Sequence, residues 1–258
     1  MSRPSSAPRR IVCLSTESAD ILCRLGAARR IVGVSAYVPA SAVLQGVPRV
    51  SGFSAANIDA ILALKPDLVL GYSDVQAGIA TRLIKDGLNV LVTQQISLCE
   101  IEDTILLLGR IVGKEARARA LIRQFRDHLK TRRSRPLRVY FEEWPEPMIS
   151  GIGWVSELVE RAGGQDIFRE LRDRRRASKR LVSIKEIVRR DPHVIIASWC
   201  GKKVRLDEIR QRPGWERIEA VKHCRVYGMD SNIILQPGPV LVDGFRELCR
   251  ILGGISLP

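Results

Sequence analysis

Long apolar runs are absent from this sequence. Its apolar stretches, such as residues 68–70 and 194–196, have the length of strands, and none approaches the roughly eighteen residues that a membrane span needs. Residues 1–10 are polar and lack the apolar core of a secretory signal. We therefore expect no membrane insertion. As the sequence stands we expect a cytoplasmic protein, or a periplasmic one if a signal peptide has been removed.

The sequence is also poor in the groups that carry most enzyme chemistry. It contains only three histidines, and none lies near a serine or cysteine in a pattern that suggests a general base. A Gly-X-Ser-X-Gly nucleophile elbow and a glycine-rich phosphate loop are both missing. The six cysteines show no Cys-X-X-Cys or zinc-finger spacing, which favours reduced thiols. We predict a protein that is not an enzyme and has no cofactor or resident metal of its own.

Positive charge is in excess, with a formal net charge of +14. Arginine is concentrated in residues 132–135 and 172–180. Such runs can contact phosphates, but no interleaved aromatic residues and no nucleic-acid motif accompany them here. We interpret both runs as solvated loops and predict no nucleic-acid partner.

Two segments of the chain have nearly the same pattern. In residues 57–70 an amphipathic helix ends before a proline and is followed by a buried strand, and residues 183–196 repeat this arrangement. Each segment is preceded by a strand, a loop and a helix that ends at a glycine, Gly26 in the first half and Gly163 in the second. The duplication predicts two similar lobes rather than one continuous sheet.

Between these halves, residues 100–133 have apolar residues at helical spacing and predict a connector. The strands are apolar throughout rather than alternating, which is typical of parallel strands buried on both faces. We therefore predict an α/β fold in which two similar lobes with mainly parallel sheets are joined by a long helix, with a ligand cleft between the lobes. The expected boundaries are 1–113 for the first lobe, 114–136 for the connecting helix and 137–258 for the second lobe. We expect a monomer.

Aromatic residues are scarce, yet many of them follow predicted strands. Ligands bind beyond the carboxyl ends of parallel strands, where stacking and apolar contact can hold a bulky molecule. The ligand-binding candidates that we place there are Tyr37, Phe53, Tyr72, Glu142, Trp144, Trp154, Trp199, Cys200 and Asp230. The three tryptophans of this set fit equally well a role in filling the lobe cores.

Three stretches, residues 10–15, 50–54 and 57–70, resemble the cobalamin-binding proteins of ABC importers. Residues 163–168 and 182–196 are also similar to this family, which belongs to the helix-linked class of periplasmic binding proteins for corrinoids, siderophores and haem. The resemblance implies a solute-binding protein that holds a corrinoid, cobalamin or a cobinamide-like compound, in an aromatic-lined cleft. The missing signal makes the chain an atypical member.

Other ligands and roles remain open. One alternative is a binding protein for an iron chelate, haem or a metal ion. Another is an enzyme, or a cytoplasmic metal or corrinoid chaperone, that uses Glu142, Glu143 and Cys200 as reacting or ligating groups, with Asp230 close enough to complete a metal site. An exposed acidic pair beside a small apolar thiol explains the same residues without a metal.

The chain departs from the family pattern in two respects. Members that serve importers carry an acidic residue on each lobe that docks the permease, but residues 73–79 offer only Asp74 and residues 232–236 offer no acid. An ABC permease is therefore an implied partner whose docking residues are not evident. The residues around Glu142, Trp199 and Gln236 also differ from the general pattern, and we predict that they adapt the site to a modified corrinoid or to a different ligand.

Overall fold

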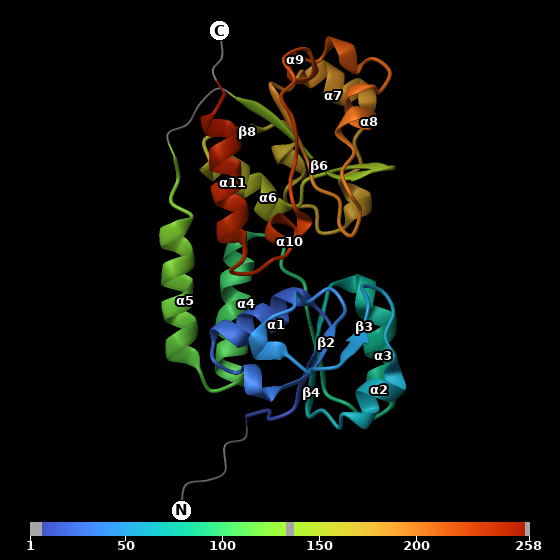
Figure 1. Cartoon of the computed structure of the whole chain (residues 1–258), viewed down its shortest axis with the longest axis vertical. Coiled ribbons are helices and arrows are strands. Elements are labelled where there is room, and N and C mark those ends of the chain that lie inside the picture. Colours follow the sequence, from blue (N-terminus) through green and yellow to red (C-terminus); the bar gives the residue numbers. More distant parts are fainter. Residues whose placement is uncertain (1–6, 133–136, 256–258) are drawn as a thin grey trace, which may run out of the picture. The chain divides into compact units, whose positions relative to one another are not determined.

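The computed structural model describes residues 7–132 and 137–255 and divides the chain into two compact units. The first unit comprises the described residues up to Gln95 together with Cys99–Gln124. The second comprises Ile96–Leu98 together with the described residues from Phe125 onward. Each unit has a sheet of its own with helices packed around it (Figure 1).

The first unit is built on a five-stranded sheet in which every strand is parallel to its neighbours. The strand order is β3-β2-β1-β4-β5, so β1 and β4 form its centre. The strands are β1 (Ile11–Cys13), β2 (Ile31–Ser35), β3 (Arg49–Ser51), β4 (Leu68–Tyr72) and β5 (Val90–Thr93). The helices around them are α1 (Thr16–Arg24), α2 (Ile58–Ala63) and α3 (Ala77–Lys85), with short 3-10 turns η1 (Ala28–Arg30), η2 (Ala42–Leu44) and η3 (Asp74–Gln76).

Helices cover both faces of this sheet. Val69 of β4 packs in a buried cluster with Ile61 of α2 and Leu83 of α3. Its neighbour Leu70 points to the opposite face, where it lines a small internal cavity with Ile21 of α1. Figure 1 shows α2 and α3 on one side of the strands and α1 on the other. Successive residues of β4 therefore meet different helices, which is why the strand is apolar throughout.

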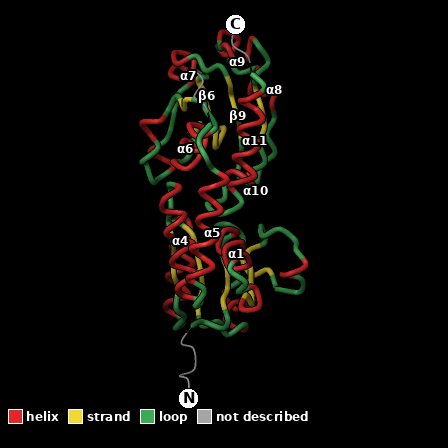
Figure 2. The backbone as a smooth tube through the Cα atoms, turned by 90° about the vertical axis from the view of Figure 1, so that its left-hand side faces the viewer, coloured by secondary structure: helices red, strands yellow, loops and turns green. Residues whose placement is uncertain are grey.

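The second unit has the sheet order β10-β9-β6-β7, and β8 pairs with the beginning of β6. Its pairs are parallel except for the hairpin of β6 and β7, and Figure 2 shows β6 and β9 side by side. The strands are β6 (Arg138–Pro145), β7 (Met148–Ser150), β8 (Gln165–Asp166), β9 (Val194–Ala197) and β10 (Val226–Gly228). The helices are α6 (Gly153–Arg161), α7 (Ile184–Arg190), α8 (Leu206–Arg210), α9 (Glu219–Lys222), α10 (Ser231–Ile234) and α11 (Leu241–Gly253), with 3-10 turns η4 (Arg169–Leu171), η5 (Ala177–Lys179) and η6 (Trp215–Arg217).

This sheet is also buried on two faces. Tyr140 of β6 packs in a buried cluster with Ile195 of β9 and Ile187 of α7. Val139, one residue earlier, faces the other way and lies toward Leu252 of α11. Side chains of β6 therefore alternate between two packed layers, as the strand geometry requires.

The predicted duplication and fold class are confirmed. In the first unit α2 leads into β4, and in the second α7 leads into β9. Asn57 and Ser183 cap the two helices, and each side-chain oxygen accepts the backbone N–H three residues on, at 3.0 and 3.2 Å. The residues before the two prolines, Lys65 and Asp191, share the left-handed backbone conformation, with φ of 45° and 44°. The two central strand pairs, β1 with β4 and β6 with β9, are both parallel.

The connecting helix that the sequence predicts over residues 114–136 corresponds to α5 (Glu115–His128), and a separate helix, α4 (Leu98–Ile111), precedes it within the predicted first lobe. Gly113 separates them with a φ of 66°, a conformation that glycine adopts at little cost. α5 ends before the expected boundary at residue 136, and residues 133–136 lie outside those described. The division between the units falls within α5. No helix in the described parts of the chain is both long enough and apolar enough to cross a membrane.

We predict that Gly153→Ala destabilises the protein. Gly153 begins α6, and a Cβ there would stand far inside van der Waals contact of the backbone oxygens of Ile96 and Arg172. Because neither backbone can move cheaply, the free energy of unfolding should fall by about 1–3 kcal/mol. Gly78→Ala in α3 is the control, since nothing lies within 4 Å of its added Cβ, and it should be neutral or stabilising by up to about 1 kcal/mol. Equal urea midpoints for the two variants would contradict this account.

Candidate ligand-binding surfaces

The carboxyl ends of the first sheet carry the aromatic residues of the first unit. Tyr37 follows β2, Phe53 follows β3 and Tyr72 ends β4. Tyr37 is 53% exposed, Phe53 49% and Val75, in η3, 45%. Tyr72 is half-buried, and its hydroxyl donates to the backbone oxygen of Gln95 at 3.3 Å. We call Tyr37, Phe53, Tyr72 and Val75 the first strand-end surface, because exposed apolar groups at such an edge mark a place for binding.

The loop between β2 and β3 adds a hollow beside this edge. Its residues, together with Arg49, line an open pocket of about 500 Å³, which is within the range that small ligands occupy. One nitrogen of the Arg49 guanidinium, Nη1, donates to the backbone oxygens of Ser35, Ala36 and Val38 at 3.1, 2.8 and 2.7 Å. Arg49 thereby holds the start of the loop, which carries Tyr37, against β3.

A buried glutamine holds the strand ends together. Gln76 is 3% exposed, and its Nε2 donates to the backbone oxygens of Leu14 at 3.0 Å and Phe53 at 3.1 Å. Its Oε1 accepts the backbone N–H of Tyr72 at 2.9 Å. The loops after β1, β3 and β4 are therefore joined by one side chain. The sequence does not predict this role, since nothing in the residues around Gln76 marks it as buried.

A second buried polar residue lies close to the same edge. Glu17, in the first turn of α1, is 5% exposed and lines an internal cavity of about 10 Å³ with Thr93 and Thr104. Its Oε1 has no hydrogen-bond partner among the described residues. Burial disfavours the charged form and raises the pKa of Glu17 to about 7, while a hydrogen bond from Ser15 opposes the shift.

This raised pKa predicts a pH-dependent stability. The folded protein holds the Glu17 proton more tightly than the unfolded chain, so the free energy of unfolding should fall between about pH 4.5 and pH 7 and then level off. The contribution of this one group is about 3 kcal/mol at most. Glu17→Gln should therefore be more stable than the wild type at pH 8 and nearly equal to it at pH 4.5. Guanidinium unfolding at both pH values measures the gap, and a gap that does not change with pH would rule Glu17 out as its cause.

In the second unit, Glu142 is fully buried near the end of β6. Arg212 donates from both terminal nitrogens to its two carboxylate oxygens. Two further donors reach it, the Tyr140 hydroxyl at 3.3 Å and Trp199 Nε1 at 3.2 Å. The Arg212 guanidinium also lies 4.6 Å from the ring centroid of Trp215. Glu142 thus has no exposed surface to offer a ligand, and its predicted direct contact with one does not agree with the structure.

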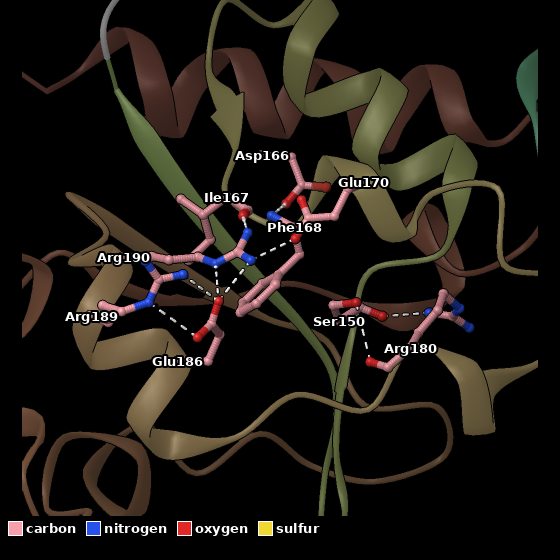
Figure 3. Close-up of polar contacts among 9 residues, drawn as sticks. All are labelled: Ser150, Asp166, Ile167, Phe168, Glu170, Arg180, Glu186, Arg189 and Arg190. Atoms are coloured by element: carbon pink, nitrogen blue, oxygen red, sulfur yellow. Dashed lines mark hydrogen bonds and ion pairs between the residues drawn. The ribbon is translucent and has the colours of Figure 1, made fainter.

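Glu143 points to the opposite side of β6 and is bound by a second arginine, which is buried. Arg180 is 1% exposed and donates to the two carboxylate oxygens of Glu143 at 2.6 and 2.9 Å. It also donates to the backbone oxygen of Ser150, whose hydroxyl donates to the Arg180 carbonyl at 3.2 Å (Figure 3). The backbone N–H of Ile152 donates to Glu143 at 2.8 Å. The prediction that Arg180 belongs to a solvated loop is therefore wrong.

Because of these ion pairs, Glu142 and Glu143 are not available as ligands for the metal site that the sequence suggested. Glu142 and Glu143 lie on different faces of the sheet, and each is neutralised by its own arginine. Cys200 lies in an exposed turn, and Asp230 caps α10 by accepting the backbone N–H of Asn232 at 2.9 Å. Over residues 7–132 and 137–255, no three His, Cys, Asp or Glu side chains gather so that they could hold a metal ion. The described residues therefore provide no set of metal ligands for the metal-chaperone alternative.

Two of the three predicted tryptophans belong to the core of the second unit. Trp154 is 2% exposed and donates to the backbone oxygen of Ile234 at 3.0 Å, and Trp199 is 3% exposed. Their predicted role as walls of a cleft does not agree with this burial, which leaves neither ring a face for a ligand. Trp144 differs, because it is half-buried and the Lys202 ammonium lies 5.5 Å from its ring centroid.

A second hollow of about 470 Å³ lies between η4 and α7, with Phe168 and Leu181 in its lining. The charged residues at its edge, Glu186 and Arg190, already pair with each other. Arg190 donates to Glu186 at 2.8 and 2.9 Å and to the backbone oxygen of Ile167, and its guanidinium lies 4.3 Å from the Phe168 centroid (Figure 3). This hollow is therefore a weaker candidate for ligand binding than the strand ends are.

We predict that Arg212→Met is strongly destabilising. It leaves the buried Glu142 carboxylate without a counter-charge, which should cost about 3–5 kcal/mol in the free energy of unfolding. The double variant Glu142→Gln/Arg212→Met removes both charges and should recover most of that loss. Chemical unfolding of the two proteins tests this, and a double variant no more stable than the single one would show that lost packing, not the buried charge, is responsible.

Comparison with known proteins finds relatives along most of the chain. The sequence pattern of the family described as periplasmic binding protein matches residues 11–233. YvrC, an uncharacterized ABC transporter substrate-binding lipoprotein of Bacillus subtilis, is 27% identical over 264 residues, which cover 94% of this chain and 79% of that protein. The vitamin B12-binding protein of Yersinia pestis is 26% identical over 266 residues, which cover 99% of this chain and 90% of that protein.

Solved structures share the fold. A possible iron-binding protein from Staphylococcus epidermidis has a TM-score of 0.80 at 22% identity and covers 96% of this chain and 99% of its own. The vitamin B12-binding protein BtuF of Vibrio cholerae has a TM-score of 0.71 at 24% identity, with 96% and 97% covered. A haem-binding protein from Pseudomonas aeruginosa has a TM-score of 0.77 at 18% identity, with 96% and 94% covered. These likenesses establish the fold and do not distinguish among ligands.

Proposed function

Because the chain belongs to the periplasmic binding protein family, we propose that it is a solute-binding protein whose ligand is a corrinoid, cobalamin or a cobinamide-like compound. Binding is its whole task in this proposal, and no residue acts as a catalyst. The vitamin B12-binding relative, which matches nearly the full length of the chain, supports the ligand class.

The first strand-end surface is the observation that carries the proposal. Tyr37 and Phe53 each keep about half of their surface exposed at the edge where parallel sheets bind ligands. A large and mostly apolar macrocycle gains from burying such rings, since each aromatic side chain removes a large area from water. Gln76 and Arg49 hold the loops of this surface through backbone contacts, so little ordering is left to be done when a ligand arrives.

Haem or an iron chelate is the second candidate. Structures described as haem-binding and iron-binding share the fold of this chain. Haem is also flat and largely apolar, so the same exposed rings suit it. Titration of the protein with a corrinoid and with haemin distinguishes the two candidates.

An ABC permease is the partner that the family supports. Acidic residues near the strand ends are few, with Asp74 at the start of η3 and Asp230 capping α10. The Asp230 carboxylate is already used within the second unit, where it accepts two hydrogen bonds from Asn232. Asp74 is therefore the better candidate for contact with a basic permease surface.

The proposal predicts a saturable change in corrin absorbance when the protein is titrated with cyanocobalamin or dicyanocobinamide. Tyr37→Ala and Phe53→Ala should each weaken binding about tenfold, because each removes an aromatic contact worth about 1–2 kcal/mol. Ile84→Ala is the matched control, since Ile84 is 59% exposed in α3 of the same unit but lies away from the strand ends. All three variants should keep the wild-type circular dichroism spectrum.

Two outcomes would overturn parts of this assignment. Saturable binding of haemin without any binding of corrinoids would transfer the function to the second candidate. Equal weakening by Ile84→Ala and Phe53→Ala would show that the first strand-end surface is not the site.

A further inference from the structure

The turn after β9 holds a lysine in a defined position. Lys202 N–H donates to the backbone oxygen of Trp199 at 3.2 Å, and Gly201, with a φ of 68°, lets the chain fold back at this point. The Lys202 ammonium lies 5.5 Å from the ring centroid of Trp144 and 6.0 Å from that of Trp199. The ammonium therefore lies within cation–π distance of two indoles, one near the end of β6 and one just after β9.

The carboxylates beside this lysine are engaged elsewhere. Glu142 is bound on both oxygens by Arg212, and Glu143 is bound on both oxygens by Arg180. Within the described residues, Lys202 makes no ion pair, and neither does the neighbouring Lys203. The end of the second sheet thus carries positive charge that the protein does not neutralise itself.

We propose that Lys202, held over Trp144, binds an acidic group of the ligand, a carboxylate or a phosphate, at the carboxyl end of the second sheet. This inference rests on the proposed solute-binding function and adds a substrate class to it: the ligand carries a negative charge. An ammonium group forms a strong charge-assisted hydrogen bond with either acid. Its aliphatic stem and the half-buried indole of Trp144 offer apolar contact to the part of the ligand next to the acid.

The test compares ligands that differ in their acid. Cyanocobalamin carries a phosphodiester, cobyrinic acid carries free carboxylates, and dicyanocobinamide carries neither. Lys202→Gln removes the charge and keeps most of the stem, whereas Lys202→Arg keeps the charge. Lys222→Gln, at an exposed lysine in α9 of the same unit, is the matched control for net charge.

We expect Lys202→Gln to weaken binding of the acid-bearing ligand about tenfold at low salt, with a smaller effect at high salt. Lys202→Arg should keep much of the affinity, and Lys222→Gln should keep all of it. Affinity for dicyanocobinamide should not change in any variant. The ligand with the larger loss, cyanocobalamin or cobyrinic acid, identifies phosphate or carboxylate as the group that Lys202 contacts.

Some results would separate this inference from the proposed function. If the wild type binds every corrinoid and Lys202→Gln weakens none of them, the lysine assignment fails while the corrinoid function stands. If the wild type binds haemin but no corrinoid, the proposed ligand is wrong, and a loss of haemin binding in Lys202→Gln that is absent for haem dimethyl ester still supports the acid contact. Equal losses for charged and uncharged ligands would mean that Lys202 acts only through the packing of Trp144.

Discussion

The proposed binding surfaces depend on a central pair of parallel strands that is buried on both faces in each unit. In β4 the neighbours Val69 and Leu70 pack against helices on opposite faces, and in β6 Val139 and Tyr140 do the same. The side chains along these strands are therefore buried against helices. Ligands of open parallel sheets bind beyond the carboxyl ends of the strands, so this packing is consistent with the proposed site at those ends.

Much of the fold could be predicted from the sequence because it depends on local order. The period of apolar residues and the proline after each helix are both read within a dozen residues of chain. The apolar period runs on through α4 and α5, and only the backbone conformation of Gly113 interrupts it, next to the predicted start of the connecting helix at residue 114. The type of element was therefore predictable, whereas the end of the helix, expected at residue 136 and found at His128, was not.

The candidate site was predictable only in part. Tyr37 and Phe53 are exposed at strand ends because they follow strands directly, which is a local fact. Arg180 is buried and Arg212 is partly buried because they pair with glutamates 37 and 70 residues away, and no local pattern reports such a pairing. In sequence Arg180 looks like the other arginines of its run. The burial of Trp199 has the same origin, since it depends on the long-range contact of its indole with Glu142.

This long-range pairing explains what the buried charges of the second unit do. A buried ion pair adds little net stability, because desolvation offsets most of the attraction, but its partners have few alternative positions once it has formed. Arg212 holds Glu142 by two hydrogen bonds, and Glu142 accepts the indole N–H of Trp199. Trp199 in turn carries the turn in which Lys202 folds back over the indoles. A surface lysine is normally mobile, so in the proposed site this chain of contacts, from the partly buried Arg212 to the exposed Lys202 ammonium, places one charge at the end of the sheet.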